Sequence, residues 1–317
     1  MMLVLLIAAT LLACAGPATT ALAPWKTSAA ALADAREATA RLASARRLVV
    51  QLQDVSFEGI ERADPDVVVV DYSWDGGARR ELTAADVNRL RSGARGRRVV
   101  LAYLSIGEAE SYRYYWRDRA DRGRATFVVG RNPSWAGNYR VRYWDEAWHD
   151  ILYGRDSYLG RIVAQGFDGV YLDTIDTADF YAAQGDSQAV PRMAELVRAV
   201  AKAGHALRPG FLVLAQNAFG ILEEPGVREA LAGIVVENHL FPAGRRPDPA
   251  STEAILSEMR GLRAAGKPVL VVEYAKDSGT QDALRRLCAE NGFLCYLGTR
   301  SLGRIGQVID SDPGNGG

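Results

Sequence analysis

The feature that most constrains this chain is a repeated alternation of short apolar runs with stretches long enough to form helices. The runs are rich in β-branched residues, and some, such as Val67–Val70 and Val269–Val272, are apolar throughout. Strands that are buried on both faces have this composition, and such strands are usually parallel. The pattern predicts eight strands, near Leu48–Gln53, Val67–Tyr72, Arg98–Leu104, Gly169–Asp173, Phe211–Gln216, Gly233–Glu237, Val269–Tyr274 and Phe293–Leu297.

The stretches between these strands carry apolar residues at helical spacing, most clearly in Ser187–Leu207 and Thr252–Ala265. Eight strands alternating with helices over about 250 residues predict an α/β fold, a single-domain (β/α)8 TIM barrel. We assign it to residues 48–305. A doubly wound open sheet is the alternative, but it favours a glycine-rich phosphate turn after the first strand, and the sequence contains no Gly-x-Gly-x-x-Gly.

The N-terminal residues 1–23 have the pattern of a signal peptide. The apolar run Leu3–Ala13 is too short to span a bilayer and fits the apolar region of a secretory signal. Two processing sites are open: Leu11–Cys14 resembles a lipobox in which Cys14 would be lipidated, and Ala21–Ala23 is an Ala-x-Ala cleavage site. We therefore expect an exported protein that is secreted, periplasmic or lipid-anchored at a bacterial cell surface.

Two further segments flank the predicted barrel. Residues 24–47 are Ala-rich and predict a spacer or a helix that lies on the domain, and residues 306–317 predict a flexible tail. The remaining cysteines, Cys288 and Cys295, flank a predicted helix–strand turn. They are expected either to form a disulfide in an oxidising compartment or to be two buried thiols.

Composition excludes some function classes. The chain has 38 basic and 38 acidic residues and a net charge of zero, which argues against a nucleic-acid-binding protein. With three histidines and no Cys/His cluster, we expect no zinc site and no other cofactor.

Polar residues follow the predicted strands at the end where TIM-barrel active sites lie. Crowded carboxylates raise one another's pKa values and cost stability, so a ring of them indicates a functional site. We expect an acidic cleft on a neutral protein, with Lys276 and Arg300 as the nearest basic residues. The strand-end residues are Asp71, Tyr72, Tyr103, Glu108, Asp173, Asp176, Asn217, Glu237 and Glu273.

Two chemistries use such a ring of carboxylates. A divalent metal would accept Asp71, Asp173 and Glu237 as oxygen ligands. Alternatively, two carboxyl groups could cleave a glycosidic bond, with one protonated and the other ionised.

The long connection between the third and fourth strands is rich in aromatic residues. Trp116, Trp135, Trp144 and Trp148 lie in it, and their faces suit stacking against sugar rings, although they could equally pack the connection onto the barrel. Other strand-end residues also have structural alternatives. The Asp176 carboxylate could cap the next helix, and Tyr103 could belong to the barrel core.

Two segments, Tyr103–Glu110 and Gly166–Asp176, resemble signatures of glycoside hydrolase family 114. This family contains endo-α-1,4-polygalactosaminidases and their bacterial and archaeal relatives, once grouped as cysteinyl-tRNA-synthetase-like extracellular proteins. The resemblance extends over roughly residues 48–302. Supporting matches are Gln51–Gln53, Asp71–Ser73, Asn132–Pro133, Gln216–Asn217, Val236–Asn238 and Val272–Tyr274.

The resemblance implies a TIM barrel with catalytic carboxylates after the fourth and sixth strands. Asp173 would be the nucleophile and Glu237 the general acid/base of a retaining mechanism. Because these strands are two apart around a barrel, the two carboxyl groups would face each other at about 5–5.5 Å, as retaining enzymes require. The residues expected to bind substrate hydroxyls or amines are Asp71, Tyr72, Tyr103, Glu108, Asp176, Asn217 and Glu273.

The expected function is therefore that of an exported, retaining endo-glycoside hydrolase of an α-1,4-linked, galactosamine-containing polysaccharide. Such a polymer is cationic when deacetylated, so an acidic cleft suits it. The alternatives are a non-catalytic carbohydrate-binding lipoprotein on the same barrel and a metal-dependent barrel enzyme. We expect no nucleic-acid partner, and membrane contact only through an N-terminal lipid anchor.

Overall fold

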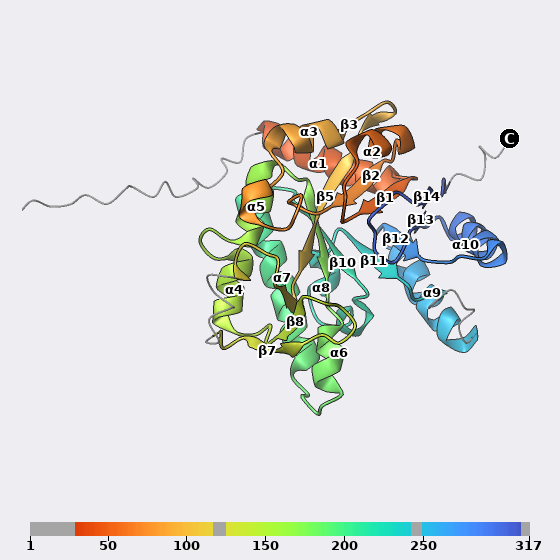
Figure 1. Ribbon diagram of the computed structural model, residues 1–317. Coiled ribbons are helices and arrows are strands. Elements are labelled where there is room, and N and C mark those ends of the chain that lie inside the picture. The colour runs from red at the N-terminus through yellow and green to blue at the C-terminus, as the bar shows by residue number, and fades with distance from the viewer. Residues whose placement is uncertain (1–28, 117–124, 242–248, 312–317) are drawn as a thin grey trace, which may run out of the picture.

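The computed structural model describes residues 29–116, 125–241 and 249–311 (Figure 1). The predicted leader, with the lipidation candidate Cys14, lies outside the described residues. The same holds for residues 312–317, the last part of the predicted tail.

Eight parallel strands form the main sheet, and their order in the sheet follows their order in the chain. A short ninth strand, which the sequence did not predict, pairs antiparallel with the eighth. The first and eighth parallel strands approach each other, so the sheet is nearly closed. The strands are β1 (Leu48–Gln51), β2 (Val67–Val70), β5 (Val99–Ser105), β9 (Gly169–Asp173), β10 (Leu212–Gln216), β11 (Gly233–Glu237), β12 (Val269–Glu273), β13 (Leu294–Leu297) and β14 (Gln307–Val308).

The predicted α/β barrel is thus confirmed, and each of the eight predicted strands is present with ends that differ by at most two residues. The apolar runs explain this agreement. The four valines of β2 are 0% exposed, and Val68 pairs in register with Val49 on one side and Val100 on the other. A strand of this kind is stable only when both of its faces are covered.

Helices cover the outside of the sheet (Figure 1). Local signals start several of them: Thr83 and Asp86 form a capping box, and Ser157 and Asp277 accept hydrogen bonds from the first turns of their helices. The α-helices are α1 (Ala29–Ser44), α2 (Phe57–Ala63), α3 (Ala84–Arg91), α4 (Glu146–Tyr153), α5 (Tyr158–Gln165), α6 (Thr177–Ala182), α7 (Ala189–Leu207), α8 (Val227–Ala230), α9 (Pro249–Ala264) and α10 (Ser278–Asn291); the 3-10 helices are η1 (Ala78–Arg80) and η3 (Phe219–Ile221).

The long connection between β5 and β9 builds its own small sheet near the carboxyl ends of the barrel strands. Strands β6 (Glu108–Glu110), β7 (Val128–Arg131) and β8 (Asn138–Val141) pair antiparallel in the order β6-β8-β7. The Tyr181 hydroxyl of α6 donates a hydrogen bond to the Val141 carbonyl, at 2.9 Å, and ties this sheet to the barrel. A second small hairpin pairs β3 (Ser92–Gly93) with β4 (Gly96–Arg97).

The Ala-rich segment forms α1, which lies on the domain. Its Ala38 and Leu42 side chains are buried, and Asp34 makes an ion pair of 2.9 Å with Arg208. At the other end of the chain, Cys288 of α10 and Cys295 of β13 form a disulfide. None of the described helices is both long enough and apolar enough to cross a membrane.

Candidate active site

A cavity of about 680 Å³ opens at the carboxyl ends of the barrel strands, beside the β6-β8-β7 sheet. Its lining is strongly acidic. The carboxyl groups in it belong to Asp54, Asp71, Asp75, Glu108, Glu110, Asp173, Asp176 and Glu237, whereas the arginines are Arg113, Arg140 and Arg300. The predicted acidic cleft is therefore present in the structure, and Arg300 lines it as one of its few cations.

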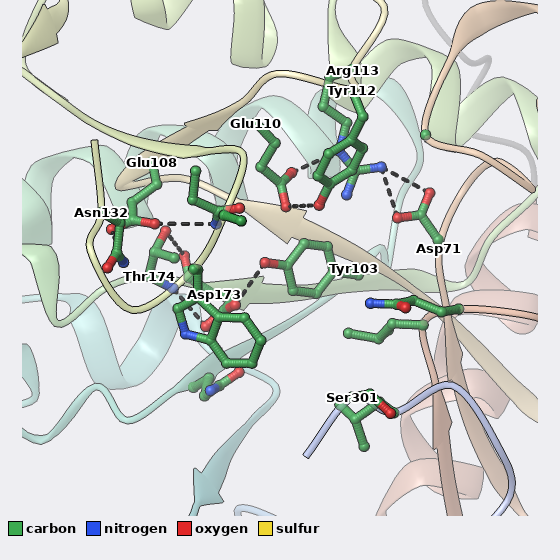
Figure 2. Close-up of a pocket in the computed structure, with 18 of the residues that line it drawn as sticks. Asp71, Tyr103, Glu108, Glu110, Tyr112, Arg113, Asn132, Asp173, Thr174 and Ser301 are labelled. Atoms are coloured by element: carbon green, nitrogen blue, oxygen red, sulfur yellow. Dashed lines mark hydrogen bonds and ion pairs between the residues drawn. The ribbon is translucent and has the colours of Figure 1, made fainter. Parts of the chain in front are cut away.

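Asp173 ends β9 at the floor of the cavity, where Tyr103 reaches it from β5. Tyr103 pairs in register with Tyr171, two residues before Asp173, and its hydroxyl donates a 2.7 Å hydrogen bond to Asp173 Oδ2. Figure 2 shows the phenol pointing at the carboxyl group. The Thr174 N–H donates to Asp173 Oδ1, at 2.7 Å, so both carboxyl oxygens are held. Tyr103 thus lines the cleft and contacts one of its carboxyl groups directly.

The turn after β5 is packed tightly against Thr174. The Thr174 hydroxyl accepts a 2.8 Å hydrogen bond from the Gly107 N–H and lies 2.9 Å from the Ser105 hydroxyl. A Cβ atom at Gly107 would come within 2.1 Å of the Thr174 carbonyl oxygen, so only glycine fits there. This close approach joins the two segments that carry the family-like sequence signatures.

Glu237 ends β11, two strands from β9. Its Oε2 accepts a 3.1 Å hydrogen bond from the Tyr171 hydroxyl, and its Oε1 accepts one from the Tyr274 hydroxyl. The Asn217 side chain fixes the backbone here, since its Oδ1 accepts from the Glu237 N–H at 2.9 Å. Asp173 and Glu237 are therefore carried by alternate strands, β9 and β11, and both line the cavity.

The chain leaves three consecutive strands through left-handed backbone. Thr174, Asn217 and Asn238 have φ values of 62°, 49° and 53°. Asparagine tolerates this region, but a β-branched residue such as threonine is strained in it. Strain of this kind persists where surrounding contacts enforce it, and at Thr174 the contacts with Gly107 and Ser105 do so.

The two carboxyl groups affect each other electrostatically. Burial, and secondarily the negative charge of Glu237, raise the pKa of Asp173 to about 8. Burial also raises the pKa of Glu237, although the hydrogen bonds from Tyr274 and Tyr171 oppose this shift. Because the groups interact, they titrate as a pair that retains one proton up to about pH 8. One protonated and one ionised carboxyl is the state that glycosidic bond cleavage needs.

Glu108 lines the cavity from β6. The side-chain amides of Asn132 and Asn138 donate to its two oxygens, at 2.8 and 3.1 Å, and burial raises its pKa. Both asparagines flank the β7–β8 turn, so Glu108 anchors that hairpin to the cleft (Figure 2).

Asp71 lines the cavity but its charge is already compensated. Arg113 Nη1 donates a 2.8 Å hydrogen bond to Asp71 Oδ1 and forms an ion pair of 2.7 Å with Oδ2, while its Nε donates to Glu110 at 2.6 Å (Figure 2). The Arg113 side chain is 0% exposed. The sequence analysis did not assign a role to Glu110 or Arg113. Their spacing of three residues permits a pair, but nothing in the sequence shows that the arginine is buried.

Asp176 lines the cavity, and its carboxylate does not cap helix α6, although it stands at the N-cap position. Burial raises its pKa, and the negative charge of Asp179 adds to the shift. Asp176 therefore faces the cleft, and its role in substrate binding stays a prediction.

The structure places three of the expected binding residues away from the cavity lining. Tyr72 is 0% exposed and donates its hydroxyl proton to the Gly76 carbonyl. Glu273 is 0% exposed as well, and its Oε1 accepts from the Leu240 and Phe241 N–H groups, at 2.8 and 3.3 Å. Asn217 positions the Glu237 backbone, as described above. These three side chains support the site without facing the cleft.

The aromatic residues divide between packing and the cleft. Of the four tryptophans in the long connection, Trp148 is fully buried and Trp144 packs edge-on against Tyr181, whereas Trp135 lines the cavity and is 44% exposed. Trp74, which the sequence analysis overlooked, also lines the cavity and is 38% exposed. Its position directly after Asp71–Ser73 is the signal that could have identified it.

Among the described residues, no group of three or more His, Cys, Asp or Glu side chains is placed to hold a metal ion. The carboxyl groups of Asp173 and Glu237 each accept a hydrogen bond from a tyrosine, and such a pair can do acid/base and nucleophilic chemistry.

Glycoside hydrolases use a pair of carboxyl groups, and this barrel carries such a pair on alternate strands beside an acidic cleft. The family model of glycoside hydrolase family GH114 matches residues 29–313, and the chain belongs to this family. The match includes α1 as well as the barrel.

Two relatives share most of the chain. An uncharacterized protein of Deinococcus radiodurans is 36% identical over 245 residues, which are 76% of this chain and 75% of that protein. An uncharacterized protein of Thermotoga maritima is 30% identical over 232 residues, 72% of this chain and 70% of that protein.

Solved structures show the same fold. The glycoside hydrolase domain of PelA from Pseudomonas aeruginosa is similar with a TM-score of 0.63 and 21% identity, over 83% of this chain and 98% of that domain. An α-L-fucosidase from Paenibacillus thiaminolyticus is similar with a TM-score of 0.52 and 14% identity, over 82% of this chain and 47% of that enzyme.

Proposed function

We propose that this glycoside hydrolase cleaves an α-1,4-linked, galactosamine-containing polysaccharide internally, with retention of configuration. The observation that carries the proposal is the pair Asp173 and Glu237, which stand on alternate strands and face a single cavity with an excess of carboxylates. The raised pKa of Asp173 supports one protonated and one ionised carboxyl in this pair.

In the first step the ionised Asp173 carboxylate attacks the anomeric carbon, and Glu237 donates its proton to the departing glycosidic oxygen. The bond from the anomeric carbon to that oxygen breaks, and a bond to Asp173 forms. In the second step Glu237 takes a proton from water as the water oxygen attacks the anomeric carbon, which releases Asp173. Tyr103 and the Thr174 N–H stabilise the ionised nucleophile through their hydrogen bonds to it.

The substrate class follows from the charge of the cleft. Eight carboxyl groups and three arginines line it, and Arg113 is neutralised by Asp71 and Glu110. A cleft of this charge attracts protonated amines and repels uronic acids. Exposed Trp74 and Trp135 rings add apolar faces for sugar rings.

Cleavage within a chain requires room beyond the catalytic pair. A second cavity of about 480 Å³ lies against the same β7–β8 turn and shares Asn132, Trp135, Ala136 and Asn138 with the main one. This neighbouring space supports an endo-acting enzyme. We further propose export by way of residues 1–23, and N-terminal sequencing of the mature protein distinguishes lipidated Cys14 from cleavage after Ala23.

The decisive experiment incubates the purified protein with deacetylated and with N-acetylated galactosaminan and measures new reducing ends. We expect cleavage of the deacetylated polymer, with products whose initial anomeric configuration, followed by NMR, is retained. Asp173→Asn and Glu237→Gln should each lower the rate by at least about a thousandfold while leaving the fold unchanged. Wild-type rates in either variant, or inverted products, would contradict the assignment.

A further inference from the structure

Arg300 lines the cleft without an ion pair to any described carboxylate, and its guanidinium lies over an exposed tryptophan. The Arg300 guanidinium carbon is 5.0 Å from the centre of the Trp135 ring. The two residues come from distant parts of the chain: Trp135 from the β7–β8 turn, and Arg300 from the segment between β13 and β14. Both residues line the main cavity, so the contact joins two distant segments at the cleft.

Trp135 is presented rigidly. The Asn132 N–H donates to the Asn138 carbonyl at 2.9 Å, and the Asn138 N–H donates to the Trp135 carbonyl at 3.2 Å. The side chains of both asparagines are bonded to Glu108, so the turn is fixed to the cleft wall. The indole itself is 44% exposed and lines both cavities. Because the Trp135 ring is exposed to both cavities, it offers a surface for binding and does not belong to the core.

Arg300, by contrast, is held only weakly. Among the described residues its guanidinium has no hydrogen bond or ion pair, and its ring contact is the interaction that the structure gives it. Arg161 and Arg192 also lie over aromatic rings, but each of them is anchored by an ion pair as well, to Glu81 and Asp186. Removing Arg300 from Trp135 therefore breaks one exposed cation–π contact, worth little in water.

We propose that the Trp135 face is a binding subsite for a protonated amino-sugar ring, and that Arg300 occupies this face as an internal competitor. The inference rests on the proposed function and names the subsite that would discriminate cationic from neutral sugars. A tryptophan face attracts an ammonium group in the same way as it attracts a guanidinium. Arg300 lines the main cavity but not the second, so it covers Trp135 from the catalytic side, in the path of the polymer. An incoming amino sugar replaces it.

The proposal requires that removing Trp135 and removing Arg300 change the binding affinity in opposite directions. Binding is measured by calorimetry in the Asp173→Asn background with deacetylated galactosamine oligomers. We expect Trp135→Ala to weaken binding about tenfold and Arg300→Gln to strengthen it about threefold. Trp135→Phe should restore part of the loss. With N-acetylated oligomers, which carry no ammonium group, both changes should be smaller.

Arg304→Gln is the matched control, because Arg304 is an exposed arginine on the same segment and lies outside the cavity lining. Equal tightening in Arg300→Gln and Arg304→Gln would mean that only net charge matters, and would overturn the inference, as would unchanged binding in Trp135→Ala. If the wild-type protein cleaves and binds the polymer, either of these two results refutes the proposed subsite and leaves the proposed function standing. If it neither binds nor cleaves, the proposed function fails as well.

Discussion

At the scale of single residues, the proposed chemistry rests on the Asp173–Glu237 pair. Tyrosine hydroxyls hold both carboxyl groups, and burial, together with the negative charge of Glu237, raises the pKa of Asp173 and so favours one proton on the pair. The sequence motif identifies both carboxylates. It does not identify Tyr171 and Tyr274 as the hydrogen-bond donors to Glu237, because that depends on the register of neighbouring strands.

The shared proton predicts the alkaline limit of activity. As the pH rises through about 8, the pair loses its last proton, so no acid remains for the leaving oxygen and kcat/KM should fall. Tyr103→Phe removes a hydrogen bond that stabilises ionised Asp173, so the alkaline limb should move upward by about one pH unit while the maximal rate drops. The measurement is a pH–rate profile of both proteins. An alkaline limb at the same pH in both proteins would show that the Tyr103 hydrogen bond does not change the pKa of the carboxyl pair.

At the scale of elements, Arg113 joins the end of β2 to β6 through two carboxylates. Its side chain is 0% exposed, so Arg113→Leu leaves two buried, uncompensated charges and should lower the free energy of unfolding by about 3–5 kcal/mol. Urea denaturation at pH 7 measures this loss.

Two further variants test whether burial explains the loss of stability in Arg113→Leu. Arg228 also bridges two carboxylates, Glu223 and Glu258, but it is 35% exposed, so Arg228→Leu should cost at most about 1 kcal/mol. Combining Arg113→Met with Asp71→Asn and Glu110→Gln should recover most of the stability, because no unpaired charge remains. A large loss in Arg228→Leu, or no recovery in the triple variant, would contradict burial as the cause.

The disulfide between α10 and β13 closes a short loop outside the cavity lining. Its two cysteines are seven residues apart, so replacing both Cys288 and Cys295 with alanine should lower the free energy of unfolding by about 2 kcal/mol. Neither cysteine lines the cavity, so kcat/KM at 25 °C should stay unchanged. Thermal unfolding with and without a reductant measures the effect, and an activity loss in the folded variant would reveal a link to the site.

At the scale of the whole molecule, charge is balanced globally and unbalanced locally. The chain has 38 basic and 38 acidic residues, yet eight carboxyl groups and three arginines line the cleft. The sequence analysis expected this local excess from the strand-end residues. Asp54, Asp75 and Glu110 join it in the structure, while Glu273 turns away to bind the backbone after β11.

The local excess predicts a strong dependence on salt. Raising the ionic strength from 0.05 to 0.5 M screens the cleft and should lower kcat/KM for the deacetylated polymer on the order of tenfold. The N-acetylated polymer, if cleaved, should be nearly insensitive. Steady-state rates at constant pH test this, and equal salt responses for both polymers would mean that the cleft charge does not recruit the substrate.

The sequence by itself determined the barrel and the position of the Asp173 and Glu237 carboxylates at one end of it. Strands such as β2 can be stable only in a doubly covered parallel sheet, and carboxylates at the ends of β9 and β11 must then meet at one face. The tertiary structure alone decided which polar side chains share the cleft. Arg113 and Trp74 enter it, while Tyr72 and Glu273 stay outside. Side-chain direction and burial at a strand end depend on contacts with loops distant in sequence, and no local pattern encodes those contacts.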